Sequence, residues 1–123
     1  MPASRIWARV AEDYAPFDVN VTTEEPPLDD LIKSDAGDSR WGTRVVIGPN
    51  TWYSSAGGVA YVGSFNWNSD TPCFVFNSSE NGITEASSHE VGHTLGLGHD
   101  GNSTSAYYTG HGSGATSWGP IMG

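Results

Sequence analysis

The chain has 123 residues, enough for one domain that buries roughly two-thirds of the surface its unfolded form exposes. Its 5 basic and 14 acidic residues give a net charge of −9, which argues against nucleic acid or an anionic membrane as a partner. No apolar run reaches the ~18 residues of a membrane span, and the N-terminus lacks the apolar core of a signal peptide. We expect residues 1–123 to form a single domain.

The N-terminal part of the chain predicts one helix and two strands. Apolar residues at helical spacing predict a helix over 5–14. Alternation of apolar and polar residues predicts a half-buried strand over 17–23. The acidic, proline-containing stretch 24–38 is expected to be a loop, and the β-branched run 43–47 predicts a second strand.

The C-terminal part predicts two more extended segments and a second helix. Two leading glycines in the segment 57–65 favour an edge strand or a bulge there. Residues 73–76 predict a further strand and residues 85–95 a helix. The Gly/Ser/Thr-rich stretch 98–119 is expected to be either a surface loop or an ordered wall held by bound ions. The expected fold class is therefore α+β, with a twisted mixed sheet of about four strands backed by both helices.

The only cysteine, Cys73, excludes an internal disulfide framework. Its neighbours are apolar and β-prone, which favours a buried side chain that acts as a small hydrophobe. A reactive thiol or an intermolecular bridge is the alternative.

Three residues of the helix 85–95 suggest a metal site. His89 and His93 are four residues apart, so their side chains project from one face of a helix and can bind one Zn²⁺. The side chain of Glu90 projects from the helix about 100° around the axis from that of His89, and so lies beside the metal position. A base must lie there to take a proton from a water at the zinc.

Two later residues extend this pattern. Gly96 can adopt a positive φ, end the helix and turn the chain back, so that His99 approaches the same ion from another side. Three neutral histidines leave a fourth position open, as catalytic zinc sites do. The HExxH spacing also occurs on solvated helix faces, but the added glycine, third histidine and Asp100 rarely arise without a metal.

The stretch HEVGHTLGLGHD, residues 89–100, resembles the metzincin pattern HExxHxxGxxHD. Its trailing Asp100 resembles the adamalysin/reprolysin branch more than the astacins or matrixins. The segment 7–23 resembles the helix and following strand of bacterial reprolysin-like secreted zinc proteases. The residues PIMG at 120–123 resemble the Met-turn, whose methionine, here Met122, lies under the zinc as a hydrophobic base. The resemblance covers most of the chain, but only residues 89–100 are specific on their own.

The resemblance implies a zincin/metzincin-like fold with two parts. Residues 1–98 would form an upper subdomain that contains the active-site helix. Residues 99–123 would form a shortened lower subdomain, truncated because metzincins continue beyond the Met-turn into a further helix. Structural roles fall to Gly96 and Met122, and an extracellular, secreted location is implied.

The resemblance also implies a metalloendopeptidase, with Zn²⁺ bound by His89, His93 and His99 and water activated by Glu90. A peptide or protein substrate would lie extended along the edge strand 57–65. Two alternatives remain: a zinc-holding module that binds peptides without catalysis, and a zinc hydrolase of a non-peptide amide. Glu90 argues against the first, since a purely structural site gains nothing from this carboxylate.

Other polar residues have less specific interpretations. His111 is expected to be a solvated loop histidine, with a contact to substrate or to the metal ligands as the alternative. Tyr107 and Tyr108 are expected to anchor the loop 98–119. The acidic composition also suits Ca²⁺, although the spacing of the aspartates at positions 29, 30, 35 and 38 does not match an EF-hand and favours a solvated face.

Overall fold

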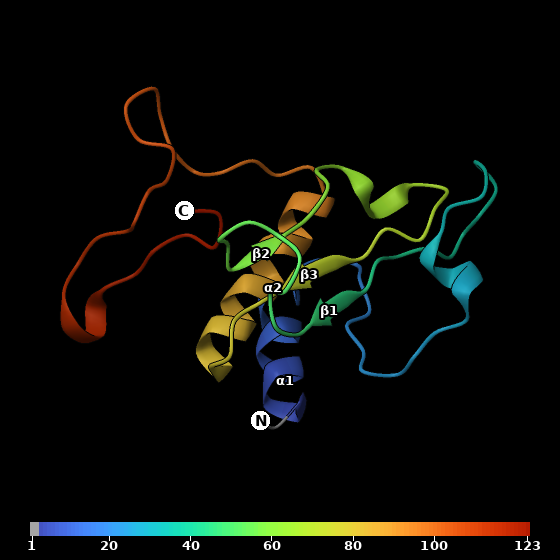
Figure 1. The fold of residues 1–123 in the computed structure, drawn as a ribbon, viewed down its shortest axis with the longest axis horizontal. Helices are drawn as coiled ribbons and strands as arrows, with labels where there is room; N and C mark the ends of the chain where they lie inside the picture. The colour runs from blue at the N-terminus through green and yellow to red at the C-terminus, as the bar shows by residue number, and fades with distance from the viewer. Residues whose placement is uncertain (1–2) are drawn as a thin grey trace.

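The computed structural model describes residues 3–123. Two α-helices and three β-strands form the body of the domain (Figure 1). The helices are α1 (Ala3–Asp13) and α2 (Glu80–Thr94), and the strands are β1 (Val45–Ile47), β2 (Gly58–Val59) and β3 (Cys73–Val75). Short 3₁₀ turns occur at Leu28–Leu31, Ser64–Asn66 and Gly114–Thr116. None of the helices in the described residues is long and apolar enough to cross a membrane.

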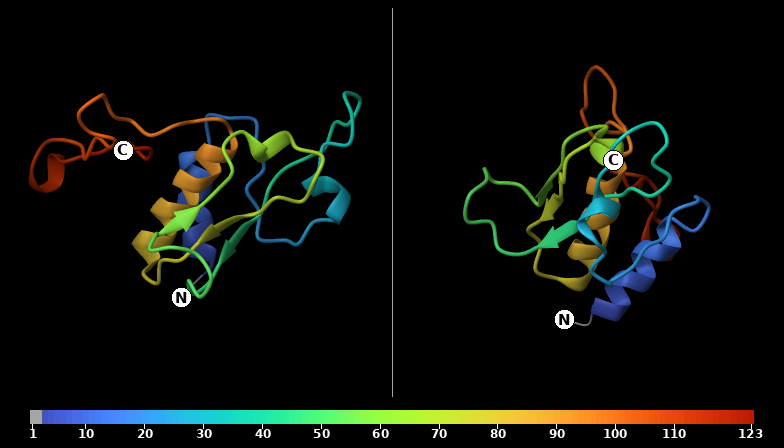
Figure 2. Two further views of the ribbon diagram at one scale, coloured as in Figure 1. Left: turned by 45° about the horizontal axis from the view of Figure 1, so that its top comes forward. Right: turned by 90° about the vertical axis from the view of Figure 1, so that its right-hand side faces the viewer.

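The elements form three layers, with α2 between the sheet and α1 (Figure 2). Both helices therefore lie on the same side of the sheet, and the expected α+β class is confirmed. Residues 99–123 leave the C-terminal end of α2 and extend to one side of this body (Figure 1).

The sheet has the order β1-β3-β2 and is mixed, as predicted. β1 pairs with β3 in parallel, and β2 pairs with β3 in antiparallel orientation. Cys73 and Val75 are fully buried, whereas Phe74 between them is not, because alternate side chains of a strand point to opposite faces. Cys73 thus fills the core as predicted, and burial raises the pKa of its thiol to about 12.

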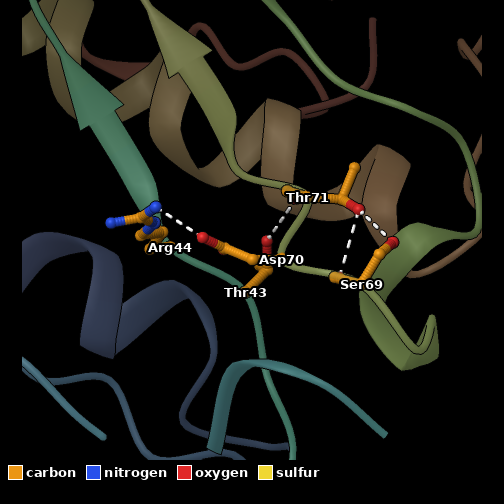
Figure 3. Close-up of polar contacts among 5 residues, drawn as sticks. All are labelled: Thr43, Arg44, Ser69, Asp70 and Thr71. Carbon is orange, nitrogen blue, oxygen red and sulfur yellow. Dashed lines mark hydrogen bonds and ion pairs between the residues drawn. The ribbon is translucent and has the colours of Figure 1, made fainter. Parts of the chain in front are cut away.

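Polar contacts hold the start of β1 against the residues that precede β3 (Figure 3). The backbone N–H of Cys73 donates to the carbonyl oxygen of Arg44 at 3.0 Å. The hydroxyl of Thr43 donates to the carbonyl oxygen of Thr71 at 3.1 Å. Arg44 also forms an ion pair with Asp70, which is partly exposed and therefore contributes about 1 kcal/mol or less. The register of the β1–β3 pair is set mainly by the backbone bonds.

The helix α1 fixes the position of α2 through its C-terminal end. Val10 is buried, and the hydroxyl of Tyr14 donates to the carbonyl oxygen of Ser88 at 2.7 Å. The hydroxyl of Ser88 in turn donates to a carboxylate oxygen of Asp13 at 2.6 Å. Burial raises the pKa of Tyr14 to about 12, so its hydroxyl stays a donor at neutral pH. These bonds hold α2 at the residue that precedes His89.

The predicted strand over 17–23 is wrong. These residues form bends and irregular chain, and Phe17, with 61% of its surface exposed, does not face the core. The segment is held instead by the indole N–H of Trp7, which donates to the carbonyl oxygen of Val21 at 2.6 Å. No described strand pairs with it, which is why the described sheet has three strands rather than four.

Two predicted segments have different bounds in the structure. The helix predicted over 85–95 begins earlier, at Glu80, because the hydroxyl of Ser79 caps it by accepting from the N–H of Gly82 at 3.0 Å. The segment 57–65 is a strand only at Gly58–Val59. Beyond it, Gly63 adopts a φ of +77° and turns the chain into a 3₁₀ turn.

Candidate metal centre

Three histidine side chains converge at the C-terminal end of α2. His89 and His93 lie one turn apart on the helix, and His99 follows the helix end. The Nε2 atom of His93 is 3.1 Å from Nε2 of His89 and 3.1 Å from Nε2 of His99. The ligand atoms of all three lie within 4.8 Å of one another. The structure therefore brings together all three residues that the sequence suggested as metal ligands.

Backbone carbonyls determine which nitrogen of two of these rings faces the cluster. Nδ1 of His89 lies 2.7 Å from the carbonyl oxygen of Ile121, and Nδ1 of His93 lies 2.7 Å from that of Leu97. A carbonyl oxygen only accepts, so each Nδ1 carries the proton and donates it. In the neutral rings each Nε2 then presents a lone pair. Two lone pairs facing each other at 3.1 Å repel unless a cation lies between them.

A helix-ending turn delivers His99 to the cluster. Gly96 has a φ of +99°. The N–H of Gly96 donates to the carbonyl oxygen of His93 at 2.9 Å, and the N–H of Leu97 donates to the carbonyl oxygen of Gly92 at 3.0 Å. This pair of bonds is the Schellman motif, which requires a left-handed residue and favours glycine. The same turn places the Leu97 carbonyl against the ring of His93.

Glu90 lies beside the histidines, between α2 and the edge strand β2. Its side chain is buried, and its Oε2 atom has no hydrogen-bond partner in the described part of the chain. A Cβ atom on Gly58 would lie only 2.9 Å from Cγ of Glu90, so the absence of a side chain at Gly58 makes room for this carboxylate. Burial raises the pKa of Glu90, while His89 and His93 act in the opposite direction.

The turn at Pro120–Gly123 packs against the same helix. The N–H of Gly123 donates to the carbonyl oxygen of Pro120 at 3.0 Å and closes the turn. Met122 within it is buried, and its Sδ atom lies against Gly92, between the first two histidines of α2. The N–H of Asp100 donates to the carbonyl oxygen of Met122 at 2.7 Å, which ties the turn to the residue after His99.

Of two further aromatic residues, Tyr107 contacts this cluster and His111 does not. The ring of Tyr107 packs against the ring of His99 in a tilted arrangement, with centroids 4.2 Å apart and an angle of 36° between the planes. His111 does not join the other histidines; it is exposed, with Nδ1 at 2.6 Å from the hydroxyl of Tyr108 and its ring 4.4 Å from Trp118. His111 is a loop histidine, as predicted.

The aspartates of the loop 24–38 make local contacts. The carboxylate of Asp38 accepts from the N–H groups of Ser34 and Arg40, both at 3.0 Å, and these bonds lower its pKa. Asp30 pairs with Arg40 at 3.4 Å. Within residues 3–123, the three histidines are the only group of side chains placed to share a metal ion, so the geometry gives no support to a calcium site.

The donor set fits zinc. Zinc–nitrogen bonds of about 2.0–2.1 Å in a tetrahedral arrangement separate the nitrogens by about 3.3 Å, close to the 3.1 Å between adjacent Nε2 atoms.

The sequence of residues 18–122 matches the profile of metallopeptidase family M12. The chain belongs to this family. A search of curated proteins found no match. The M12 assignment supports a metzincin-like catalytic domain, as the resemblance of residues 89–100 implied.

Several features of this M12 site could not be found from the sequence. The carbonyl oxygens of Leu97 and Ile121 orient two histidine rings, but any residue supplies a carbonyl, so the sequence carries no signal for them. The contacts of Gly58 and Gly92 are only weakly signalled, by glycines inside a strand and a helix. The HExxHxxGxxHD motif and, less specifically, the Met-turn-like residues 120–123 pointed to the site.

Proposed function

We propose that this chain is a zinc-dependent metalloendopeptidase of the metzincin type. The observation that carries the proposal is the convergence of three Nε2 atoms, with two of the rings oriented by backbone carbonyls so that their lone pairs face inward. Two such lone pairs at 3.1 Å are favourable only around a cation. His89, His93 and His99 are the proposed zinc ligands.

Zinc in this site would polarise the scissile carbonyl and lower the pKa of a water, the Lewis-acid chemistry that peptide hydrolysis needs. Glu90 is the proposed general base. Its carboxylate takes one proton from the attacking water while the oxygen bonds to the carbonyl carbon. Glu90 then gives that proton to the amide nitrogen as the C–N bond breaks, which leaves a carboxylic acid and an amine, and the acid then passes its remaining proton to the amine to give a carboxylate and an ammonium group.

The environment of Glu90 suits this role. Its pKa is raised by burial, so the protonated form that follows the first step is less unfavourable than for a solvated carboxyl. Its Oε2 atom is buried and has no competing hydrogen-bond partner in the described part of the chain. The backbone at Gly58 closes one side of the carboxylate and limits its movement.

The proposed substrate is a peptide that pairs with the edge of the sheet. β2 lies at the end of the order β1-β3-β2 within the described residues, and Gly58 contacts Glu90. The N–H of Gly63, after β2, donates to the carbonyl oxygen of His93 at 2.9 Å, so this edge runs beside the histidines. An extended peptide added there would pass the base and the metal ligands. Peptides N-methylated near the cleaved bond should lose hydrolysis if backbone pairing holds the substrate.

Structural roles are proposed for two residues. Gly96 turns the chain so that His99 can join the cluster, and Met122 packs beneath the two helical histidines. The division into subdomains at residue 98 and an extracellular location remain predictions of the resemblance.

The direct test is to purify the chain, measure its zinc and follow casein hydrolysis at neutral pH. One zinc per chain and hydrolysis abolished by a chelator and restored by zinc are expected. A fully zinc-loaded chain that binds peptides but hydrolyses none would instead favour the binding module. Hydrolysis of small amides alone would favour the non-peptide hydrolase.

A further inference from the structure

Among the three proposed ligands, His99 is held differently from the other two. His89 and His93 lie on a helix and each donates from Nδ1 to a backbone carbonyl at 2.7 Å. His99 lies beyond the helix, is exposed, and its Nδ1 donates to no group in the described part of the chain. The orientation of its ring must therefore depend on another contact.

That contact is the ring of Tyr107, whose centroid lies 4.2 Å from that of His99 at an interplanar angle of 36°. Close packing of two tilted rings favours one plane of the imidazole over rotation about its side-chain bonds. We propose that Tyr107 is a positioning residue that holds the third ligand ring in the orientation needed for metal binding. This inference rests on the zinc site proposed above.

The chain between the two rings is shaped to bring Tyr107 back to His99. The N–H of Tyr108 donates to the carbonyl oxygen of Asp100, and the N–H of Asn102 donates to that of Ser105 at 2.7 Å. The side-chain oxygen of Asn102 accepts from the N–H groups of Thr104 and Ser105, both at 2.9 Å. These bonds close the segment 100–108 into a loop, which we call the return loop.

The closure of the return loop depends on Gly101. A Cβ atom there would overlap the carbonyl oxygens of Ser105 and Ala106 on the opposite side of the loop. The hydroxyl of Ser105 donates to the carbonyl oxygen of Tyr107 at 2.8 Å and further fixes the residue that carries the stacking ring. Stacking on His99 is therefore a consequence of local sequence, not of a distant part of the fold.

The test compares the zinc affinity of the wild-type chain with that of Tyr107→Ala, Tyr107→Leu and Tyr107→Phe. Each affinity is measured by letting the whole chain compete with a chromophoric chelator for zinc. Substitution of groups that orient a metal-bound histidine costs about 10–100-fold in metal affinity. We expect the Ala and Leu variants to bind zinc about 10-fold more weakly and the Phe variant to bind it as tightly as wild type, since Phe keeps the ring. Tyr108→Ala is the matched control, because its ring lies against His111 and Trp118.

A second comparison separates positioning from general loosening of the loop. In a chain that already carries His99→Ala, Tyr107→Leu should change the residual zinc affinity less than twofold. Equal affinity of the wild type, Ala and Leu variants overturns the inference while leaving the zinc site intact. Weakening that persists in the His99→Ala background also overturns it. A wild-type chain that binds no zinc overturns both this inference and the proposed function.

Discussion

Gly92 and Met122 are in direct contact, since a Cβ atom on Gly92 would lie 2.7 Å from Sδ of Met122. Gly92 lies between His89 and His93 in α2. Met122 belongs to the turn in which the neighbouring carbonyl, that of Ile121, orients the ring of His89. The closeness of helix and turn at this point therefore sets the geometry of a proposed ligand.

Gly92→Ala should destabilise the protein. Alanine favours a helix over glycine by about 1 kcal/mol, but overpacking against Met122 costs about 1–3 kcal/mol. We expect a net loss of about 1 kcal/mol in the free energy of unfolding, measured with urea on metal-free protein. Gly48→Ala is the control, because nothing lies within 4 Å of a Cβ atom at that position. A Gly92→Ala variant that is more stable than wild type by about 1 kcal/mol, the gain expected from helix propensity alone, would contradict the close contact.

Gly96→Ala tests the turn that delivers His99. A Cβ atom at Gly96 would meet nothing within 4 Å, so any cost comes from its φ of +99° alone. Left-handed backbone costs a residue with a side chain about 1–2 kcal/mol, and asparagine tolerates it better than alanine. The free energy of unfolding, measured with urea, should be highest for wild type, lower for Gly96→Asn and lowest for Gly96→Ala. A stabilising Gly96→Ala would show that the turn does not form as described.

Gly58→Ala tests the link between the edge strand and Glu90. A Cβ atom there would lie 2.9 Å from both Cγ of Glu90 and the carbonyl oxygen of Phe74, so either the carboxylate or the strand must shift. We expect zinc content to remain one per chain while kcat/KM for a peptide falls at least about tenfold, as misplaced catalytic groups do. Gly57→Ala, which would meet only the side chain of Asn77, is the matched control. Unchanged kcat/KM in Gly58→Ala would contradict the proposed position of the base.

The pH dependence of stability tests the burial of Glu90. Burial raises its pKa above the ordinary 4.5, so the folded chain binds this proton more tightly than the unfolded chain. The stabilisation is fully present below pH 4.5 and is lost as the pH rises through the folded pKa. Metal-free Glu90→Gln should therefore melt at a higher temperature than metal-free wild type at pH 7. The difference should shrink as the pH falls through the folded pKa towards 4.5 and change little below that, and a less stable variant at pH 7 would contradict the burial of Glu90.

The metal ligands could be predicted from the sequence because their geometry is local. The spacing of His89 and His93 is fixed by the helix, and the turn at Gly96 follows from one residue that adopts a left-handed conformation without strain. The strands at 43–47 and 73–76 also carried local signals, in their β-branched and aromatic residues, and the structure contains most of each.

The features that the sequence did not reveal depend on contacts that leave no hydrophobic periodicity or propensity signal. Apolar and polar residues alternate in the segment 17–23 as they do in a strand, but no strand of the described residues pairs with it. A hydrogen bond from the indole N–H of Trp7 holds the segment instead. The start of α2 at Glu80 was missed because glycine at position 82 is a poor helix former, whereas the Ser79 cap offsets this weakness. The stacking of Tyr107 on His99 depends on closure of the return loop, which no periodicity signals.

The measurement that tests the proposed function most directly is peptide hydrolysis by zinc-loaded Glu90→Gln. Glutamine keeps the size of the side chain but cannot take the proton of the attacking water. Zinc content should stay at one per chain, and the hydrolysis rate should fall by at least about 10²–10⁴, the contribution of general-base catalysis. Hydrolysis at the wild-type rate by the fully zinc-loaded variant would contradict the proposal.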